Sequence, residues 1–161
     1  MPDTTHTTLA DKTARFAQLH RGPAALVMPN PWDAGTAQLL AKLDFAALAS
    51  SGAACAMALG RRDGEVPCDE ALAHARTIVL ALDLPVAADL ENDFGHTPTD
   101  AALTIRLAGE VGLCSGSTED ASGEAAQPLY DFNHAVDRVA TAAEAEREVS
   151  ESGTFGYIDR L

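Results

Sequence analysis

Short apolar runs alternate with longer, periodically apolar segments along most of this chain. The apolar runs cover residues 24–28, 45–49, 84–88 and 112–117. Each run is followed by a segment whose apolar residues recur every three or four positions, which is typical of an amphipathic helix. One further helix is expected before the first run, around Leu9, Phe16 and Leu19. The alternation predicts an α/β fold with four strand-then-helix units, a parallel sheet and helical crossovers.

The expected helices differ in how clearly the sequence marks them. Asp33 can cap one helix, and Thr97 followed by Pro98 and Asp100 is a good start for another. The clearest buried stripe comprises Ala71, Leu72, Ala75, Ile78, Val79 and Leu82. The last helix is expected to bury Val136, Val139, Ala140 and Ala143.

Composition and charge then narrow the possible functions. The chain has 161 residues, about one domain, and a formal net charge of −13. Charge of that sign repels phosphate backbones and anionic lipid, so we expect no nucleic-acid or membrane partner. The first eight residues do not resemble a signal peptide, and three cysteines without a C-x-x-C spacing support neither disulfides nor structural zinc. A cytoplasmic protein is the default expectation.

Polar residues gather just after each predicted strand. They are Asn30 and Asp33, then Ser50 and Ser51, then Asp89 and Glu91, and finally Glu119. In parallel α/β folds the carboxyl ends of the strands form the ligand-binding edge. No glycine-rich phosphate-binding motif follows any strand, which disfavours a nucleotide site. The pattern is typical of part of a (β/α) barrel.

Three carboxylates are candidates for metal binding at this edge. Asp89 and Glu91 are two residues apart, so they share a face if the strand continues, and Glu119 takes the corresponding place one strand later. A hard divalent cation such as Mg²⁺ would relieve their mutual repulsion. The alternative is that each is a helix cap or a solvated loop residue.

Three further residues can be interpreted either as binding or catalytic residues or as ordinary turn residues. Ser51 and Gly52 offer a hydroxyl and an unobstructed backbone amide that could hold a carboxylate or enolate oxygen, or they form a simple turn. Asp63 is a catalytic acid or base, or only a turn residue in its glycine-rich loop. The five histidines show no pairing that suggests a metal-ligand set.

Several motifs together resemble one enzyme family. They are residues 26–35 (LVMPNPWDAG), 59–64 (LGRRDG), 88–92 (ADLEN), 116–121 (GSTEDA) and 128–131 (PLYD). Their order and intervals resemble the isocitrate lyase/phosphoenolpyruvate mutase superfamily, in its phosphonomutase-like branch, often named after carboxyvinyl-carboxyphosphonate phosphorylmutase. The resemblance covers about residues 10 to 148.

The resemblance implies a partial (β/α)8 TIM-type barrel and a Mg²⁺-dependent lyase or mutase. Such an enzyme acts on C–C or P–C bonds beside an α-oxo acid and passes through an enolate. By resemblance, Asp89, Glu91 and Glu119 would surround Mg²⁺, mostly through water, with Asp89 also near the substrate. Ser51 and Gly52 would hold the oxo-acid's oxygens, and Asp63 would lie in a mobile gating loop.

Three departures from the family's pattern set further expectations. Asp93 stands where a small residue is common, and should add negative charge beside the metal. Residues 120–127 lack the Cys, Lys and His of the lyase loop, which argues against a classical isocitrate or methylisocitrate lyase. Residues 149–161 do not match the fifth strand expected near Val149.

The chain is therefore divided into residues 1–148, the N-terminal half of such a barrel, and residues 149–161, a divergent C-terminal tail. Half a barrel leaves sheet edges open, so a homo-oligomer or another partner is expected to cover them. Two functions remain: an enzyme impaired by truncation, or a non-catalytic, oligomerising remnant of the same fold.

Overall fold

The computed structural model describes residues 7–151 and 158–160 of the chain. Six helices and four strands lie within these residues. The helices are α1 (Leu9–His20), α2 (Ala34–Lys42), α3 (Gly52–Ala58), α4 (Cys68–Leu80), α5 (Pro98–Glu110) and α6 (Phe132–Glu151). The strands are β1 (Leu48–Ala49), β2 (Val86–Asp89), β3 (Ser115–Thr118) and β4 (Ile158–Arg160).

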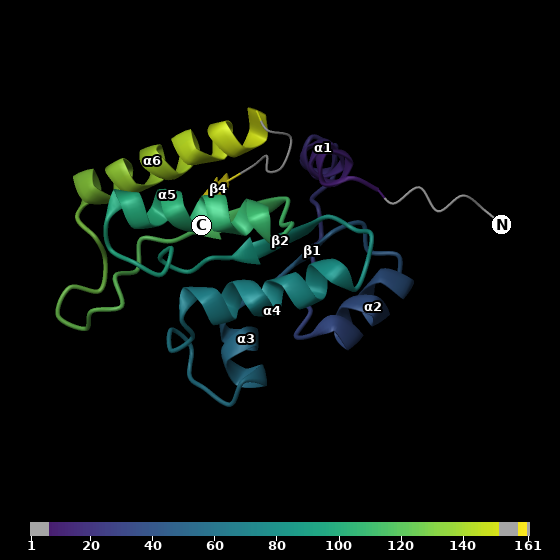
Figure 1. Cartoon of the computed structure of the whole chain (residues 1–161), viewed down its shortest axis with the longest axis horizontal. Helices are drawn as coiled ribbons and strands as arrows, with labels where there is room; N and C mark the ends of the chain where they lie inside the picture. The colour runs from purple at the N-terminus through teal and green to yellow at the C-terminus, as the bar shows by residue number, and fades with distance from the viewer. Residues whose placement is uncertain (1–6, 152–157, 161) are drawn as a thin grey trace.

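The four strands form one parallel sheet in chain order, β1-β2-β3-β4. Consecutive parallel strands require a crossover each time, and helices make these crossovers here (Figure 1). Ala87 pairs with Ser115 and Asp89 with Ser117, so β2 and β3 end at the same edge. The predicted parallel sheet with helical crossovers is confirmed.

The main hydrophobic core lies between the sheet and α2, α4, α5 and α6. Val86, Ala88 and Leu90 point into it, and Ile78 and Ile105 meet them from α4 and α5. These five side chains are at most 3% exposed. The predicted stripe is confirmed for Leu72, Ala75, Ile78 and Val79, which are buried on α4. Burying such a stripe is what holds a crossover helix against a sheet.

The opposite face of the sheet is covered by α1. Phe16, which is 2% exposed, packs with Ala47, Ala87 and Cys114 in a smaller core. Alternate residues of a strand point to opposite faces, so Ala87 faces α1 while its neighbours face the main core. The expected N-terminal helix is confirmed.

The first predicted strand is not a strand. Residues 24–28 have no regular secondary structure, and one backbone hydrogen bond, from Ala49 N to Pro29 O at 3.2 Å, joins the following segment to β1. Pro29 and Pro31 have no N–H to donate, so a longer ladder cannot form there. The second predicted strand shortens to the two residues of β1.

Helix α6 presents a different face from the predicted one. Ala135, Arg138, Ala142 and Ala145 are buried, whereas Val136 is 40% exposed and Ala140 is also exposed. The predicted stripe of Val136, Val139, Ala140 and Ala143 is wrong because the buried face of α6 includes a charged residue, Arg138, which a pattern of apolar positions leaves out. Figure 1 shows α6 lying along α5, the helix that it packs against.

The C-terminal segment contributes to the sheet. Helix α6 continues to Glu151, and β4 pairs in parallel with β3, with Gly116 opposite Ile158. Residues 152–157 and 161 of the predicted tail lie outside the described residues. In the part of the chain that the structure describes, no helix combines the length and apolar character needed to cross a membrane.

Candidate active site at the carboxyl edge of the sheet

Strand β2 leads directly into a sharply turned acidic loop, residues 90–97. Asp89 is its last residue, Leu90 is buried, and three of the next four residues have left-handed backbone angles. Their φ values are 51° for Glu91, 59° for Asp93 and 54° for Phe94. Such angles are uncommon for residues other than glycine and cluster at functional sites. The strand therefore ends before Glu91. Asp89 and Glu91 were predicted to share a face of the sheet only if the strand continued through both, and this condition is not met.

Asp89 connects the acidic loop to the start of α3. Its Oδ2 accepts a hydrogen bond from Gly52 N at 2.9 Å, and its Oδ1 accepts one from Glu91 N at 3.0 Å. A Cβ at position 52 would lie 2.6 Å from Glu91 Oε1, so a side chain there would displace the Glu91 carboxylate. The Gly52 amide, predicted to hold substrate oxygens, is thus already paired with Asp89.

Glu91 lies among other carboxylates. Burial raises its pKa, and the negative charges of Asp63, Asp89 and Glu119 raise it further, to about 7. Burial, Asp89 and Asp63 likewise raise the pKa of Glu119. Glu119 also donates its backbone N–H to Glu91 O at 2.9 Å, which ties the loop after β3 to the loop after β2. The three predicted metal residues and Asp63 therefore share one electrostatic environment.

These carboxylates do not form a ready-made ligand cage. Among the described residues, no group of three or more His, Cys, Asp or Glu side chains is arranged to hold a metal ion. The donor set is nevertheless chemically suited to a hard cation, because its oxygens are carboxylate oxygens and every charge that shifts the Glu91 and Glu119 pKa values is negative. This chemistry fits Mg²⁺ bound partly through water.

Ser51 is the N-cap of α3, a helix that the sequence analysis did not predict. Its Oγ accepts a hydrogen bond from Ala54 N at 3.4 Å. Ser51 and Asp89 both line a cavity of about 340 Å³ on the face of the sheet that α1 covers. The Ser51 hydroxyl thus caps a helix, where the alternative to a binding role was a simple turn, and Ser51 lines a cavity together with Asp89.

Asp63 lies in the exposed loop between α3 and α4. Both arginines of this loop are paired with carboxylates of the same region: Arg61 with Glu70 at 2.9 Å and Arg62 with Glu65 at 2.7 Å. Asp63 nevertheless lies near enough to Glu91 and Glu119 to raise the pKa of each. The loop therefore brings one more negative charge to the edge.

A larger cavity opens where the loops after β1, β2 and β3 meet. Its volume is about 710 Å³. Its lining comes from residues 64–68, from the acidic loop and from residues 122–124, and includes Glu91, Asn92, His96 and Ser122. Within this described lining there is no Lys or Arg. The described lining of this cavity thus carries several carboxylates and no Lys or Arg side chain.

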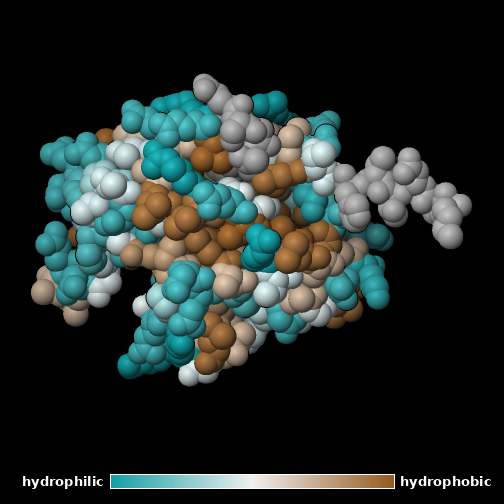
Figure 2. Space-filling model, viewed as in Figure 1, coloured by the Kyte–Doolittle hydropathy of each residue, from teal (hydrophilic) through white to brown (hydrophobic). Residues whose placement is uncertain are grey.

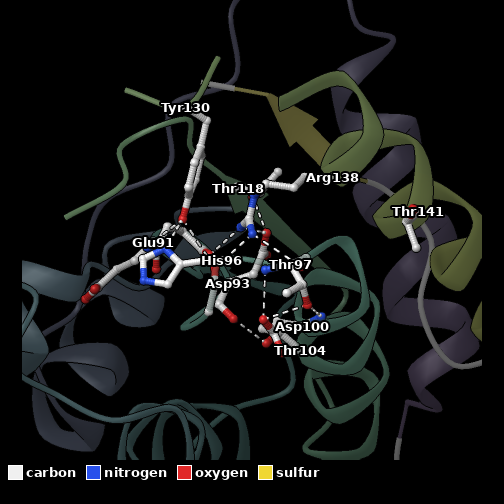
Figure 3. Close-up of polar contacts among 12 residues, drawn as sticks. Glu91, Asp93, His96, Thr97, Asp100, Thr104, Thr118, Tyr130, Arg138 and Thr141 are labelled. Atoms are coloured by element: carbon white, nitrogen blue, oxygen red, sulfur yellow. Dashed lines mark hydrogen bonds and ion pairs between the residues drawn. The ribbon is translucent and has the colours of Figure 1, made fainter. Parts of the chain in front are cut away.

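Sequence reasoning missed Arg138 and misjudged Asp93. The Asp93 carboxylate does not face the acidic edge: it is buried and forms an ion pair with Arg138 at 3.0 Å, while Thr118 Oγ1 donates to it at 2.5 Å (Figure 3). Burial raises its pKa to about 6, although Thr118 and Arg138 act in the opposite direction. The expected extra charge beside the metal is therefore wrong, because Arg138 compensates it. An arginine among buried alanines on α6 was the available signal.

The fold and the edge together define a class of protein. Consecutive parallel strands with helices packed on the outer face, and polar loops gathered at the strands' carboxyl ends, form part of a (β/α)8 barrel. The sequence model of the family described as phosphoenolpyruvate phosphomutase matches residues 16–152. The chain belongs to this family.

Curated relatives and solved structures agree with that assignment. The chain is 36% identical over 108 residues to 2-methylisocitrate lyase of Bacillus subtilis (strain 168), a match covering 66% of this chain and 35% of the relative. A second 2-methylisocitrate lyase, from Halalkalibacterium halodurans, is 38% identical over 107 residues, with the same coverage.

The crystal structure of a protein from Burkholderia cenocepacia J2315, provisionally described as a lyase/mutase, superposes with a TM-score of 0.90 and 43% identity. The match covers 94% of this chain and 54% of that one. The structure of 2,3-dimethylmalate lyase, a PEP mutase/isocitrate lyase superfamily member, has a TM-score of 0.78 at 23% identity, which supports the fold alone. The chain thus spans about a third of the curated relatives' length and about half of the solved structure's length.

Proposed function

We propose that this chain carries the metal-binding edge of a Mg²⁺-dependent lyase or mutase that acts on a C–C or P–C bond beside an α-oxo acid. The observation that carries the proposal is the environment of Glu91. Burial and three neighbouring carboxylates raise its pKa to about 7, and a bound cation would relieve the repulsion among these carboxylates. The names of the relatives, 2-methylisocitrate lyase and lyase/mutase, support the reaction class.

Asp89, Glu91 and Glu119 are the residues that would hold Mg²⁺. When bound, the ion would supply positive charge against the developing enolate oxygen. Asp89 is already oriented by the Gly52 and Glu91 amides, so its carboxylate needs no reorganisation. Ser51 lines the cavity beside Asp89, and its hydroxyl would donate a hydrogen bond to an oxo-acid oxygen. Asp63, in the loop between α3 and α4, would act as the acid or base that exchanges a proton with the substrate.

A linked-binding experiment tests this function. Oxalate, an analogue of a planar enolate, is titrated calorimetrically into the full chain with and without Mg²⁺. The proposal predicts oxalate binding only with Mg²⁺, and loss of that binding in Glu91→Gln. The matched control is Glu148→Gln, which removes an exposed carboxylate on α6 that pairs with Arg106. Oxalate binding that is equal without Mg²⁺ would contradict the proposal.

A non-catalytic module of the same fold is the second candidate. The absence of Lys and Arg from the described lining of the larger cavity favours it, because an oxo-acid dianion finds no cationic partner there. Such a module would bind neither Mg²⁺ nor oxalate at this edge, so the same titrations separate the two functions.

A further inference from the structure

The acidic loop is held by a single buried arginine from a distant helix. Arg138 lies on α6, 45 residues after Asp93, and is 2% exposed. Its guanidinium points toward the Asp93 carboxylate, as the close-up shows (Figure 3). A buried arginine is rare unless its donors are paired, and here the partners come almost entirely from one short segment.

Arg138 donates to four acceptors of this segment. Nη1 donates to Gly95 O at 2.8 Å and to Thr97 O at 3.3 Å. Nη2 donates to Asn92 O and to Asp93 Oδ2, the latter at 3.0 Å. Three of the four acceptors are backbone carbonyls, so the arginine recognises the path of the chain as well as one carboxylate. The planar fork of a guanidinium suits such recognition, whereas an ammonium group cannot reproduce it.

The segment needs such support because its backbone conformation is energetically unfavourable without stabilising contacts. Glu91, Asp93 and Phe94 all have left-handed φ values without being glycine. Conformations of this kind persist only where the surroundings fix them. The loop also carries Glu91 and Asn92 into the wall of the larger cavity, so its path decides where these side chains point.

A second layer of contacts holds Arg138 itself. Its guanidinium carbon lies 4.6 Å from the centre of the Tyr130 ring. The Tyr130 hydroxyl accepts a hydrogen bond from Asn92 Nδ2 at 3.2 Å and lies 2.9 Å from His96 Nδ1. Thr104 Oγ1 donates to Asp93 O at 2.8 Å. The guanidinium is therefore enclosed by the loop that it binds and by an aromatic ring that contacts the same loop.

We propose that Arg138 is a positioning residue of the metal-binding edge: its fork of hydrogen bonds to the loop carbonyls fixes the left-handed path that presents Glu91 to the cavity. This inference rests on the proposed function as far as the metal is concerned. Its structural part, the dependence of the loop's order on the fork, stands independently and is measured separately.

The test compares Arg138→Lys with Arg106→Lys. Arg138→Lys keeps the charge that faces Asp93 but loses the fork. Arg106→Lys alters the exposed ion pair between Arg106 on α5 and Glu148 on α6, which are 2.7 Å apart. This ion pair does not involve the acidic loop. Amide hydrogen exchange is followed by NMR at Asp93, whose N–H is bonded to Leu90 O, and at Glu119, bonded to Glu91 O. The dissociation constant for Mg²⁺ is measured calorimetrically on the same samples.

In Arg138→Lys we expect exchange at Asp93 and Glu119 to be at least about tenfold faster, with amides of α4 unchanged. Mg²⁺ binding should weaken by about 10- to 100-fold, as is usual when the support of a ligand is removed. Arg106→Lys should match the wild type in amide exchange and in Mg²⁺ affinity. Wild-type exchange in Arg138→Lys would overturn the proposal. If the wild type binds no Mg²⁺, the proposed function fails, and exchange alone still decides the role of Arg138.

Asp93→Asn keeps the inference testable should Arg138→Lys fail to fold. Asn is nearly the same shape, tolerates a left-handed φ and retains an oxygen that accepts from Thr118 and Arg138. Because the three carbonyl bonds remain, exchange at Glu119 should stay within about threefold of the wild type. Exchange accelerated by tenfold or more in Asp93→Asn would assign the positioning to the ion pair and overturn the proposal.

Discussion

Glu91 combines an unfavourable backbone angle with an unfavourable charge. Its φ is 51°, its carboxylate oxygen lies 2.6 Å from the position that a Cβ on residue 52 would take, and its pKa is raised to about 7. A residue with only a structural role would be expected to relax one of these features. Their coincidence at the edge of the sheet is typical of a site kept ready for a ligand.

Glu91→Gln should change how stability depends on pH. Between pH 4.5 and about 7 the carboxylate is ionised in the unfolded chain but protonated in the folded one, so wild-type stability falls as pH rises through this interval. Glutamine removes that loss. The variant should gain about 1 to 2 kcal/mol on the wild type between pH 4.5 and pH 8, once solvent screening of this half-buried group is allowed for.

Urea denaturation at several pH values measures this difference. Asp93, whose pKa is raised to about 6, titrates in both proteins, so its contribution cancels in the comparison. Glu65→Gln is the control, because hydrogen bonds from Arg62 lower the Glu65 pKa and remove it from this pH interval. A Glu91→Gln difference that is constant from pH 4.5 to 8 would show that Glu91 has an ordinary pKa.

Local signals in the sequence identified single residues well. Asp33 and Thr97 cap their helices through capping boxes, as predicted, because a cap depends on residues three positions apart. The pairing of Asp93 with Arg138 depends on residues 45 positions apart, and nothing local marks it. For the same reason, the sequence alone does not reveal that the Asp93 carboxylate is buried against Arg138 instead of lying beside the metal residues.

At the scale of elements, α6 shows what a pattern of apolar residues can miss. Its buried stripe contains Arg138, so a count of apolar positions selects a neighbouring face that includes Ala140 instead of Ala142. Figure 2 shows a band of apolar surface across the middle of this face of the molecule, in the region where α4 and α5 lie in Figure 1. The stripe on α4 was predicted correctly because its buried residues, Leu72, Ala75, Ile78 and Val79, are all apolar.

Replacing Ala142 with leucine tests the observed face of α6. Ala142 is fully buried against the core, so extra methyl groups should cost about 1 to 3 kcal/mol of unfolding free energy. Ala140→Leu, on the exposed side of the same helix, should change stability by less than about 0.5 kcal/mol. Chemical denaturation of both variants measures these values, and equal costs would contradict the assigned face.

At the scale of the whole molecule, the order of parallel strands was predictable because each apolar run and each helical stripe is local. The ladder itself was less predictable: residues 24–28 form no strand, whereas β4 comes from a segment that matched no family motif. Strand pairing depends on partners far apart in the chain, and edge segments have the fewest of them.

The 161-residue chain as an isolated monomer should turn over substrate slowly. Arg61 and Arg62 are paired with glutamates, and no Lys or Arg is found in the described lining of the larger cavity, so an oxo-acid dianion would be held loosely. Misplacement of substrate can cost about a hundredfold in rate. We expect kcat below about 1 per second with phosphonopyruvate, oxaloacetate or 2-methylisocitrate and Mg²⁺. A faster rate from a species shown to be monomeric would contradict this.

The central claim is that the carboxylates at the edge of the sheet bind a divalent cation. Its most direct test is a calorimetric titration of Mg²⁺ into the wild type, Glu119→Gln and Glu124→Gln. Glu124, like Glu91, lines the larger cavity, but it does not contribute to the raised pKa of Glu91. The account predicts one Mg²⁺ per chain, weakened at least about tenfold in Glu119→Gln and unchanged in Glu124→Gln. Equal Mg²⁺ affinity in all three proteins, or no binding to the wild type, would contradict it.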